Sequence, residues 1–271
     1  MQTVTPPDPM ARFKEAQKQG WAHFAPLEAF TTSAAARLVT HARISPGARV
    51  LDVACGTGVV AITAARRGAH VTGLDLTPAL LDRARDNAAL ASVPIEFHEG
   101  DVEQLPFDDE SFDVVVSQFG HIFAPRPEVA TTEMLRVLKR GGTIAFSTWP
   151  PELFVGRLFA LTAGYAPPPP VPAAPPAQWG EPPVIRERLG DRVRDIVFDR
   201  ARMLVPALSV AHVRTSLERT AGPLIKLVDA LTMSDPARLA QFREECDALI
   251  TEYLQDNEVR QDYLLTRATK G

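Results

Sequence analysis

The sequence predicts an α/β fold in which a mostly parallel sheet is covered by helices on both faces. Two observations support this prediction. Short apolar runs alternate with segments of helical spacing between residues 49 and 149, and this alternation is typical of parallel strands joined by crossover helices. A chain of 271 residues, 45% of them hydrophobic, is long enough to build one large domain or a domain with a lid.

The first 45 residues are expected to form one or two helices, broken near residues 21–26, that pack over the carboxyl edge of the sheet. Five strands are then expected at residues 50–54, 70–75, 95–99, 112–118 and 143–148. Apolar residues at helical spacing predict helices at 59–67, 78–91 and 127–139. Thr77 is expected to cap the second of these helices, and Gly141 and Gly142 to end the third.

A proline-rich segment follows. Residues 167–183 hold nine prolines in seventeen positions, which favours an extended, polyproline-like connection. Beyond it the sequence predicts strands at 192–204 and 258–269 and helices at 210–220, 224–232 and 235–254. We expect the two strands to complete the sheet and the helices to form a cap beside the ligand crevice. A separate helical domain is the alternative.

These elements divide the chain into four parts, and no internal repeat is found among them. The parts are an N-terminal helical cover (1–45), a cofactor-binding core (46–150), a proline-rich connection with a further strand and a helical cap (151–256), and the final strand of the sheet (257–271).

The composition argues against several classes of protein. The formal net charge is −4 and the basic residues are scattered, so a nucleic acid is not an expected partner. Two cysteines lie far apart, so neither a disulfide framework nor a metal site is expected. The N-terminal residues lack the apolar core of a signal peptide, and no run reaches the roughly 18 apolar residues of a membrane span. We expect a cytoplasmic protein without stable membrane insertion.

The glycine turn CGTGVVA is compatible with more than one ligand. Gly56, Gly58 and Ala61 fit the GxGxxA spacing of dinucleotide sites. A triphosphate loop is excluded, because no Lys followed by Ser or Thr comes after the glycines. Asp52, in the preceding strand, would repel a pyrophosphate but suit a cationic ligand such as S-adenosylmethionine, whose ammonium and sulfonium groups are positive. Alternatively, Asp52 hydrogen-bonds the amides of the turn, or it does both.

Two more acidic positions follow at strand ends. Asp75 lies nineteen residues past Gly56, at the end of the second strand, where a carboxylate can accept hydrogen bonds from both ribose hydroxyls. Dinucleotide enzymes share this feature. They do not generally share Asp101 after the third strand, or the acidic turn that leads through Phe112 and Asp113 into the fourth.

Four motifs occur in order: VLDVACGTG, VTGLDLTPALLDRAR, GDVEQLPFDDESFDVVVS and EMLRVLKRGGTIAFSTW. Through them the chain resembles the class I S-adenosylmethionine-dependent methyltransferases, in the small-molecule group related to the ubiquinone and menaquinone biosynthesis methyltransferases. The resemblance is strong over residues 21–150 and weak elsewhere. It implies a Rossmann-like three-layer α/β/α sandwich with a seven-stranded, mostly parallel sheet whose last strand is antiparallel.

The resemblance also implies which residues bind the methionine end of S-adenosylmethionine. Asp52, Ala54, Gly56 and Gly58 match the first motif, which wraps the methionine moiety. Gln118 matches the position that faces this moiety and the incoming acceptor. These five residues are therefore expected at one end of the cofactor site, with S-adenosylhomocysteine as the product that remains there.

The adenosine end is implied in the same way. Asp75 matches the acidic residue that binds the ribose, and Leu76 matches its neighbour that packs on the adenosine. Asp101 and Val102 match the pair that recognises adenine, by a side-chain acceptor and a backbone donor respectively.

Methyl transfer requires no protein nucleophile, and a base is needed only when the acceptor must lose a proton. His121, beyond the fourth strand, is expected at the carboxyl edge and is the candidate base; His23 is a weaker candidate. Packing within the loop is the alternative role for His121. Aromatic residues that could line an acceptor pocket, or belong to the core instead, are Phe119, Phe123, Phe154, Phe159, Tyr165 and Trp179.

The leading functional hypothesis is a methyltransferase that acts on a small, partly apolar metabolite by in-line displacement. The first alternative is an oxidoreductase that uses NAD or FAD, and the second is a catalytically inactive module that binds S-adenosylmethionine. The expected partner is the small-molecule acceptor, and the chain is expected to be a monomer or a homodimer.

Overall fold

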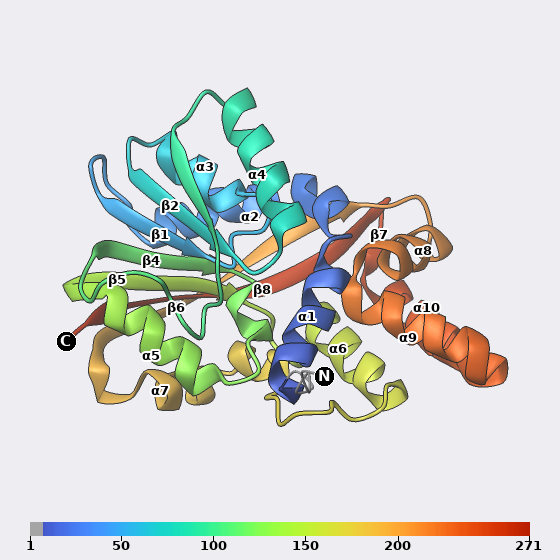
Figure 1. The fold of residues 1–271 in the computed structure, drawn as a ribbon. Helices are drawn as coiled ribbons and strands as arrows, with labels where there is room; N and C mark the ends of the chain where they lie inside the picture. Colours follow the sequence, from blue (N-terminus) through green and yellow to red (C-terminus); the bar gives the residue numbers. More distant parts are fainter. Residues whose placement is uncertain (1–7) are drawn as a thin grey trace, which may run out of the picture.

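The computed structural model describes residues 8–271, and its centre is a single sheet (Figure 1). The strands run in the order β3-β2-β1-β4-β5-β8-β6, and β7 pairs with β8. Neighbouring strands from β3 to β5 are parallel, whereas β8 is antiparallel to both β5 and β6. The strands are β1 (Arg49–Val53), β2 (His70–Asp75), β3 (Ile95–Glu99), β4 (Phe112–Gln118), β5 (Leu138–Thr148), β6 (Val193–Pro206), β7 (Leu254–Gln255) and β8 (Glu258–Lys270).

The helices form two layers over the sheet and a cap at its carboxyl edge (Figure 1). α2, α3 and α4 cover one face, α5 and α7 cover the other, and α6, α8, α9 and α10 form the cap with α1 beside them. Their bounds are α1 (Pro9–Trp21), α2 (Glu28–His41), α3 (Val59–Ala65), α4 (Pro78–Leu90), α5 (Pro127–Val137), α6 (Phe154–Tyr165), α7 (Pro182–Leu189), α8 (Val210–Thr220), α9 (Gly222–Ser234) and α10 (Pro236–Tyr253). The predicted three-layer α/β/α architecture with one antiparallel strand is confirmed, and β7 is a short addition to it.

The apolar residues gather in two clusters. The larger lies between the sheet and its two helical layers and includes the fully buried Leu51, Val115 and Phe146. The smaller lies within the cap, around Phe242 and Ile250 of α10. Parallel strands that are covered on both faces are typically built from continuous apolar runs, such as the buried residues 114–116 of β4.

Some details of the fold differ from the expectations. α2 packs on the sheet face against α3 and β6, and only its first turn, with Phe30 and Thr31, lines the cavity at the carboxyl edge together with α1. Gly141 and Gly142 do not end α5, because Leu138 is already extended and pairs with Phe112 of β4. The proline-rich segment is not extended throughout: Pro182 opens α7, where a proline is tolerated in the first turn.

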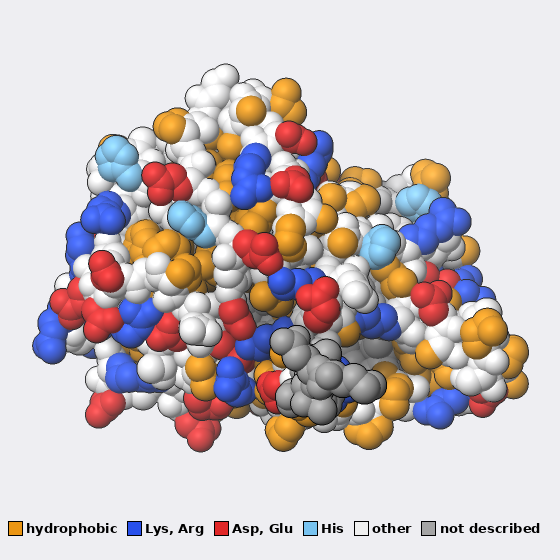
Figure 2. All heavy atoms as spheres, viewed as in Figure 1, with side chains coloured by type: hydrophobic (Ala, Val, Ile, Leu, Met, Phe, Trp, Pro, Cys, Tyr) orange, Lys and Arg blue, Asp and Glu red, His pale blue; other side chains and the backbone are white. Residues whose placement is uncertain are grey.

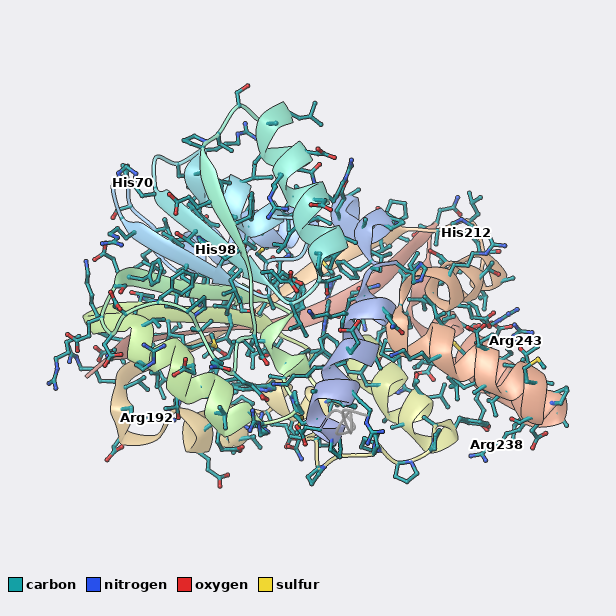
Figure 3. The ribbon with its side chains drawn as sticks, in the orientation of Figure 1. His70, His98, Arg192, His212, Arg238 and Arg243 are labelled. Carbon is teal, nitrogen blue, oxygen red and sulfur yellow. The ribbon has the colours of Figure 1, made fainter. Side chains whose placement is uncertain are left out.

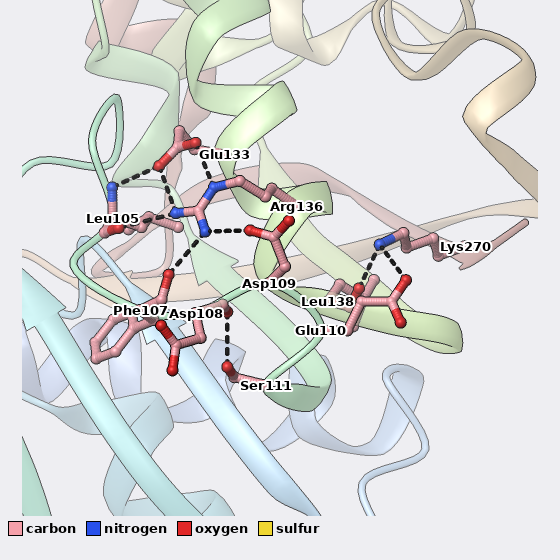
Figure 4. Close-up of polar contacts among 10 residues, drawn as sticks. All are labelled: Leu105, Phe107, Asp108, Asp109, Glu110, Ser111, Glu133, Arg136, Leu138 and Lys270. Atoms are coloured by element: carbon pink, nitrogen blue, oxygen red, sulfur yellow. Dashed lines mark hydrogen bonds and ion pairs between the residues drawn. The ribbon is translucent and has the colours of Figure 1, made fainter.

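The acidic turn of the third motif is held by one arginine (Figure 4). Arg136 of α5 donates to the carbonyl oxygens of Leu105 (2.9 Å) and Phe107 (2.7 Å). It also pairs with Asp109 at 2.8 Å and with Glu133 at 2.7 Å. The side chain is 28% exposed, so these bonds are only partly screened by water. Arg136 therefore links the turn between β3 and β4 to helix α5.

We expect Arg136→Met to lower the free energy of unfolding by about 2–3 kcal/mol, because it leaves two carbonyls and two carboxylates without their charged donor. Urea unfolding followed by circular dichroism measures this change. Arg140→Met is the matched control: Arg140 is 81% exposed and pairs with Glu110 at 3.5 Å, so its loss should change the unfolding free energy by less than about 0.5 kcal/mol. Equal effects of the two substitutions would contradict this role of Arg136.

The surface seen in Figure 2 carries Lys and Arg side chains interspersed with Asp and Glu. None of the helices within residues 8–271 combines the length and the apolar composition that a membrane crossing requires.

Candidate functional site

A cavity of about 300 Å³ opens at the carboxyl ends of β1, β2 and β4. The chain leaves β1 toward β2 and β3 on one side and returns to β4 on the other, and such a switch point is the usual ligand site of an open α/β sheet. Eight of the nine residues predicted to bind the cofactor line the cavity: Asp52, Ala54, Gly56, Asp75, Leu76, Asp101, Val102 and Gln118. Gly58, at φ +81°, begins α3 and faces Phe97 instead.

Asp52 carries a buried carboxyl group with one free oxygen. Its Oδ2 accepts a hydrogen bond from the backbone N–H of Ala61 at 3.0 Å, in the first turn of α3. Its Oδ1 is buried and has no hydrogen-bond partner among residues 8–271. Burial raises the pKa of Asp52 to about 8, and the charge of Asp75 adds to the rise. A cationic group in the cavity would supply the missing partner and favour the ionised carboxylate.

Asp75 fixes the glycine turn while it lines the cavity. Its Oδ2 accepts from the N–H of Gly56 and its Oδ1 from the N–H of Thr77, each at 2.8 Å. Burial raises the pKa of Asp75, and the two N–H donors counteract the rise. A carboxylate oxygen can accept more than one hydrogen bond, so both oxygens can still receive ligand hydroxyls.

The two loops that meet at the cavity have unusual backbone conformations. Ala54, directly after β1, has φ +52°, and Phe119, directly after β4, has φ +61°. Residues other than glycine rarely adopt this left-handed region, and they often do so at ligand sites. Between the loops, a Cβ on Gly120 would lie 2.5 Å from the Cβ of Ala54. The close approach therefore requires glycine at position 120.

Asp101 is held by helix α1. Its Oδ1 accepts from the N–H of Glu103 at 2.9 Å, and its Oδ2 pairs with Lys14. Lys14 also pairs with the buried Glu103, which in turn pairs with Arg126. Lys14 could not be identified from the sequence, because nothing local to α1 indicates a partner 87 residues away.

Gln118 has a fixed side-chain orientation. Its Nε2 donates to the carbonyl oxygen of Thr31 in α2 at 3.0 Å, and its Oε1 is buried without a partner among the described residues. The free oxygen is an acceptor in the wall of the cavity. With Asp52 Oδ1 it makes a second unsatisfied acceptor there, and both suit a ligand that donates hydrogen bonds.

His121 lies outside the cavity, which argues against its predicted role as a base. The side chain is fully buried, between the rings of Phe146 and Trp179 at centroid distances of 4.8 and 4.6 Å, and neither ring nitrogen has a hydrogen-bond partner within residues 8–271. Burial, with a contribution from the charge of Arg188, lowers the pKa of His121 to about 3. The imidazole is therefore neutral near pH 7 and has no route to an acceptor. His23 is exposed and does not line the cavity either.

We expect His121→Phe to keep methyl transfer within about threefold of the wild type, because phenylalanine fits an aromatic environment and removes two unsatisfied nitrogens. Thermal unfolding should show an equal or higher midpoint. Both are measured with the purified variant, by labelled-methyl incorporation and by calorimetry. A loss of turnover of about a hundredfold with intact cofactor binding would restore the base hypothesis.

Four of the six predicted pocket aromatics line the cavity: Phe119, Phe123, Phe154 and Phe159. Tyr165 instead donates its hydroxyl to Glu245 at 2.7 Å, and Trp179 packs on His121. The cap contributes lining residues that the sequence argument missed, among them His212 and Ser216 of α8. The two residues lie four apart in a predicted helix and therefore on the same face of it. This spacing was the sequence signal that could have identified them.

The arrangement suits a cationic ligand better than a dinucleotide. Carboxylates of Asp52 and Asp75 flank the glycine turn, and Lys14, the one Lys or Arg among the described lining residues, is already paired. A pyrophosphate would therefore meet two acidic side chains and no free cation among the described lining residues that could offset its charge. S-adenosylmethionine has an ammonium group that can donate hydrogen bonds to the two free acceptor oxygens, Asp52 Oδ1 and Gln118 Oε1. No cluster of three His, Cys, Asp or Glu residues suitable for a metal occurs within residues 8–271.

Comparisons with known proteins give a consistent result. Residues 50–142 match a family described as a methyltransferase domain. Uncharacterized protein Rv1405c of Mycobacterium tuberculosis is 36% identical over 235 residues, which cover 86% of this chain and 85% of the relative. The demethylmenaquinone methyltransferase of Clavibacter sepedonicus is 40% identical over 130 residues, which cover 46% of this chain and 52% of that enzyme.

A solved structure shares the fold. A putative methyltransferase from Bacillus halodurans C-125 superimposes with a TM-score of 0.58 at 24% sequence identity, over 88% of this chain and 99% of that one. At this identity the likeness concerns the fold alone.

Proposed function

The chain belongs to the class I S-adenosylmethionine-dependent methyltransferases, in the menaquinone-methyltransferase-like group, and from this we propose that it methylates a small, partly apolar molecule by in-line displacement. The observation that carries the proposal is the pair of free acceptors, Asp52 Oδ1 and Gln118 Oε1, in the wall of the cavity beside Asp75. When bound, S-adenosylmethionine supplies a methyl group that is already activated on its sulfonium.

We propose that Asp52 binds the cationic methionine end and that Asp75 accepts hydrogen bonds from the ribose. Ala54, Gly56 and Gly58 shape the turn that surrounds the methionine moiety. The burial of Asp52 and its one free oxygen support the first assignment. The second is supported by Asp75, which accepts hydrogen bonds from the glycine turn and also lines the cavity.

At the adenosine end we propose that Leu76 packs on the nucleoside and that Asp101 and Val102 recognise the adenine. All three line the cavity. Lys14 holds one oxygen of Asp101, so α1 closes this end of the site over the ligand. The contact leaves the carboxylate with further acceptor capacity.

The acceptor end of the cavity is formed by the cap, whose lining is mainly aromatic and aliphatic. Such walls exclude water and bind an apolar body, which are the contributions that alignment for an in-line displacement requires. The side chain of Gln118 is hydrogen-bonded to Thr31 and lies between the cofactor end and the acceptor end of the cavity, so it can orient the cofactor or the acceptor. No residue of the chain is assigned as a base in this proposal.

Methyl transfer is tested with S-adenosylmethionine labelled in its methyl group. The purified protein is incubated with size-filtered cell extracts, and the label is followed into small molecules. We expect a labelled product that is absent with Asp75→Ala protein. A wild-type protein that binds S-adenosylmethionine but labels nothing across varied extracts would instead indicate a binding module without catalysis.

Two further expectations remain proposals. We place the protein in the cytoplasm, which fits the two free, buried cysteines, Cys55 and Cys246. We propose a monomer or a homodimer with a small-molecule partner rather than a nucleic acid, which the mixed charges of Figure 2 support.

A further inference from the structure

We propose that His212 and Ser216 select the acceptor, by hydrogen bonding to an oxygen of an otherwise apolar and uncharged molecule. This inference rests on the methyl transfer proposed above and concerns the cap side of the same cavity. The two residues belong to α8, and Figure 3 shows His212 in the cap, far from His70 and His98 on the strands.

The charges in the cavity disfavour an anionic acceptor. Among the described lining residues the acidic side chains are Asp52, Asp75 and Asp101, and Lys14 is the one Lys or Arg. Lys14 is 13% exposed and pairs with both Asp101 and Glu103. A carboxylate or phosphate on the acceptor would lose its hydration and meet no free cation, so an uncharged molecule is favoured.

The walls on the cap side bind an apolar body. Side chains from four different elements meet there, among them Phe154, Leu158, Met203, Val205, Val213 and Leu224. Polar side chains that line the cap side are few: His212, Ser216 and Gln261. A mainly apolar site with a small number of placed polar groups obtains its affinity from the walls and its selectivity from those groups.

His212 presents a defined donor. The backbone N–H of Leu208 donates to its Nδ1 at 3.4 Å, so the neutral ring carries its proton on Nε2. Ser209 accepts from the N–H of His212 at 3.1 Å and begins the helix there, which fixes the backbone that carries the ring. The Nε2–H group is therefore the part of His212 left for a ligand oxygen.

Ser216 lies one helical turn after His212. Residues four apart occupy the same face of a helix, and both of these line the cavity. The hydroxyl of Ser216 can donate or accept, so the pair can bind a hydroxyl or a carbonyl oxygen but offers nothing to an anion beyond two neutral groups. His212 is exposed and Ser216 half-buried, which places the pair at the rim, where an acceptor enters.

The test uses three probes with the same apolar body: naphthalene, 2-naphthol and 2-naphthoate. Each is titrated by fluorescence at pH 8 into full-length protein saturated with S-adenosylhomocysteine, whose own binding is measured first. We expect 2-naphthol to bind about tenfold more tightly than the other two. His212→Phe and Ser216→Ala should each reduce binding of 2-naphthol by about five- to tenfold and leave naphthalene unchanged. His70→Phe is the matched control and should change neither.

The outcomes separate this inference from the proposed function. Failure of S-adenosylhomocysteine to bind the wild type would overturn the proposed function itself. If S-adenosylhomocysteine binds normally, three results would overturn the inference and leave the proposed function standing. These are that 2-naphthoate binds as well as 2-naphthol, that 2-naphthol does not bind, or that His212→Phe keeps the preference for 2-naphthol over naphthalene.

Discussion

Asp75→Asn is expected to weaken the binding of S-adenosylmethionine by at least about a hundredfold. The two proposed charge-assisted hydrogen bonds from the ribose to Asp75, each worth about 1.5–3 kcal/mol, would be lost or reversed, and about 1.4 kcal/mol corresponds to a factor of ten. The amide also directs an N–H group toward the N–H of Gly56 or Thr77, which now donate to the carboxylate. The glycine turn therefore loses its support in the same variant.

Isothermal titration calorimetry measures this loss, and circular dichroism shows whether the variant is folded. Asp82→Asn is the control, because Asp82 lies on α4 with its side chain 76% exposed and pairs with Arg85. Its affinity for S-adenosylmethionine should match the wild type. A folded Asp75→Asn protein that binds within threefold of the wild type would remove Asp75 from the cofactor site.

Asp52→Asn is expected to change stability and binding in opposite directions. The unfolded carboxyl has its ordinary pKa of about 3.9, whereas burial raises the pKa of Asp52 in the folded chain to about 8. Between these values the folded state holds a proton that the unfolded state has lost, so the free energy of unfolding falls as pH rises from about 4 to 8. The asparagine variant lacks this loss and should be more stable by about 2 kcal/mol near pH 7.

The affinity of Asp52→Asn for S-adenosylmethionine should decrease, in contrast to its stability. The free Oδ1 of Asp52 is the proposed partner of the cationic methionine end, and an amide cannot offer a negative charge to it. We expect the affinity for S-adenosylmethionine to fall about tenfold to a hundredfold.

Urea unfolding at pH 5 and pH 8, together with calorimetric titration, measures both changes for Asp52→Asn. The stability advantage should be small at pH 5 and larger at pH 8. A variant that is less stable at both pH values, or that binds S-adenosylmethionine as tightly as the wild type, would show that Asp52 serves only to cap α3 through Ala61.

Much of the fold could be predicted because local signals agree with the tertiary structure. β2, β3 and β4 and helix α8 have the bounds that the sequence predicts. β4 contains a continuous apolar run, β3 alternates apolar with polar residues, and Ser209 marks the start of α8 by its side-chain cap. The end of β1 was misplaced by one residue, because Ala54 adopts a left-handed conformation that no residue type at that position indicates.

The candidate site could be predicted where it depends on one strand end at a time. Asp52, Asp75 and Asp101 each follow or lie in a strand, and parallel strands bring their carboxyl ends to one edge. The remaining contacts join distant segments. Lys14 reaches Asp101 from α1, and Trp179 of the proline-rich segment buries His121. No local pattern specifies such contacts, so the position of His121 in the loop suggested a base that the tertiary packing encloses.

The carboxylates at the sheet edge are proposed to bind S-adenosylmethionine rather than a dinucleotide. A calorimetric titration of the wild-type protein with S-adenosylmethionine, NAD and FAD under identical conditions distinguishes these ligands. We predict saturable one-to-one binding of S-adenosylmethionine and no binding of either dinucleotide. Binding of NAD or FAD without binding of S-adenosylmethionine would contradict the account.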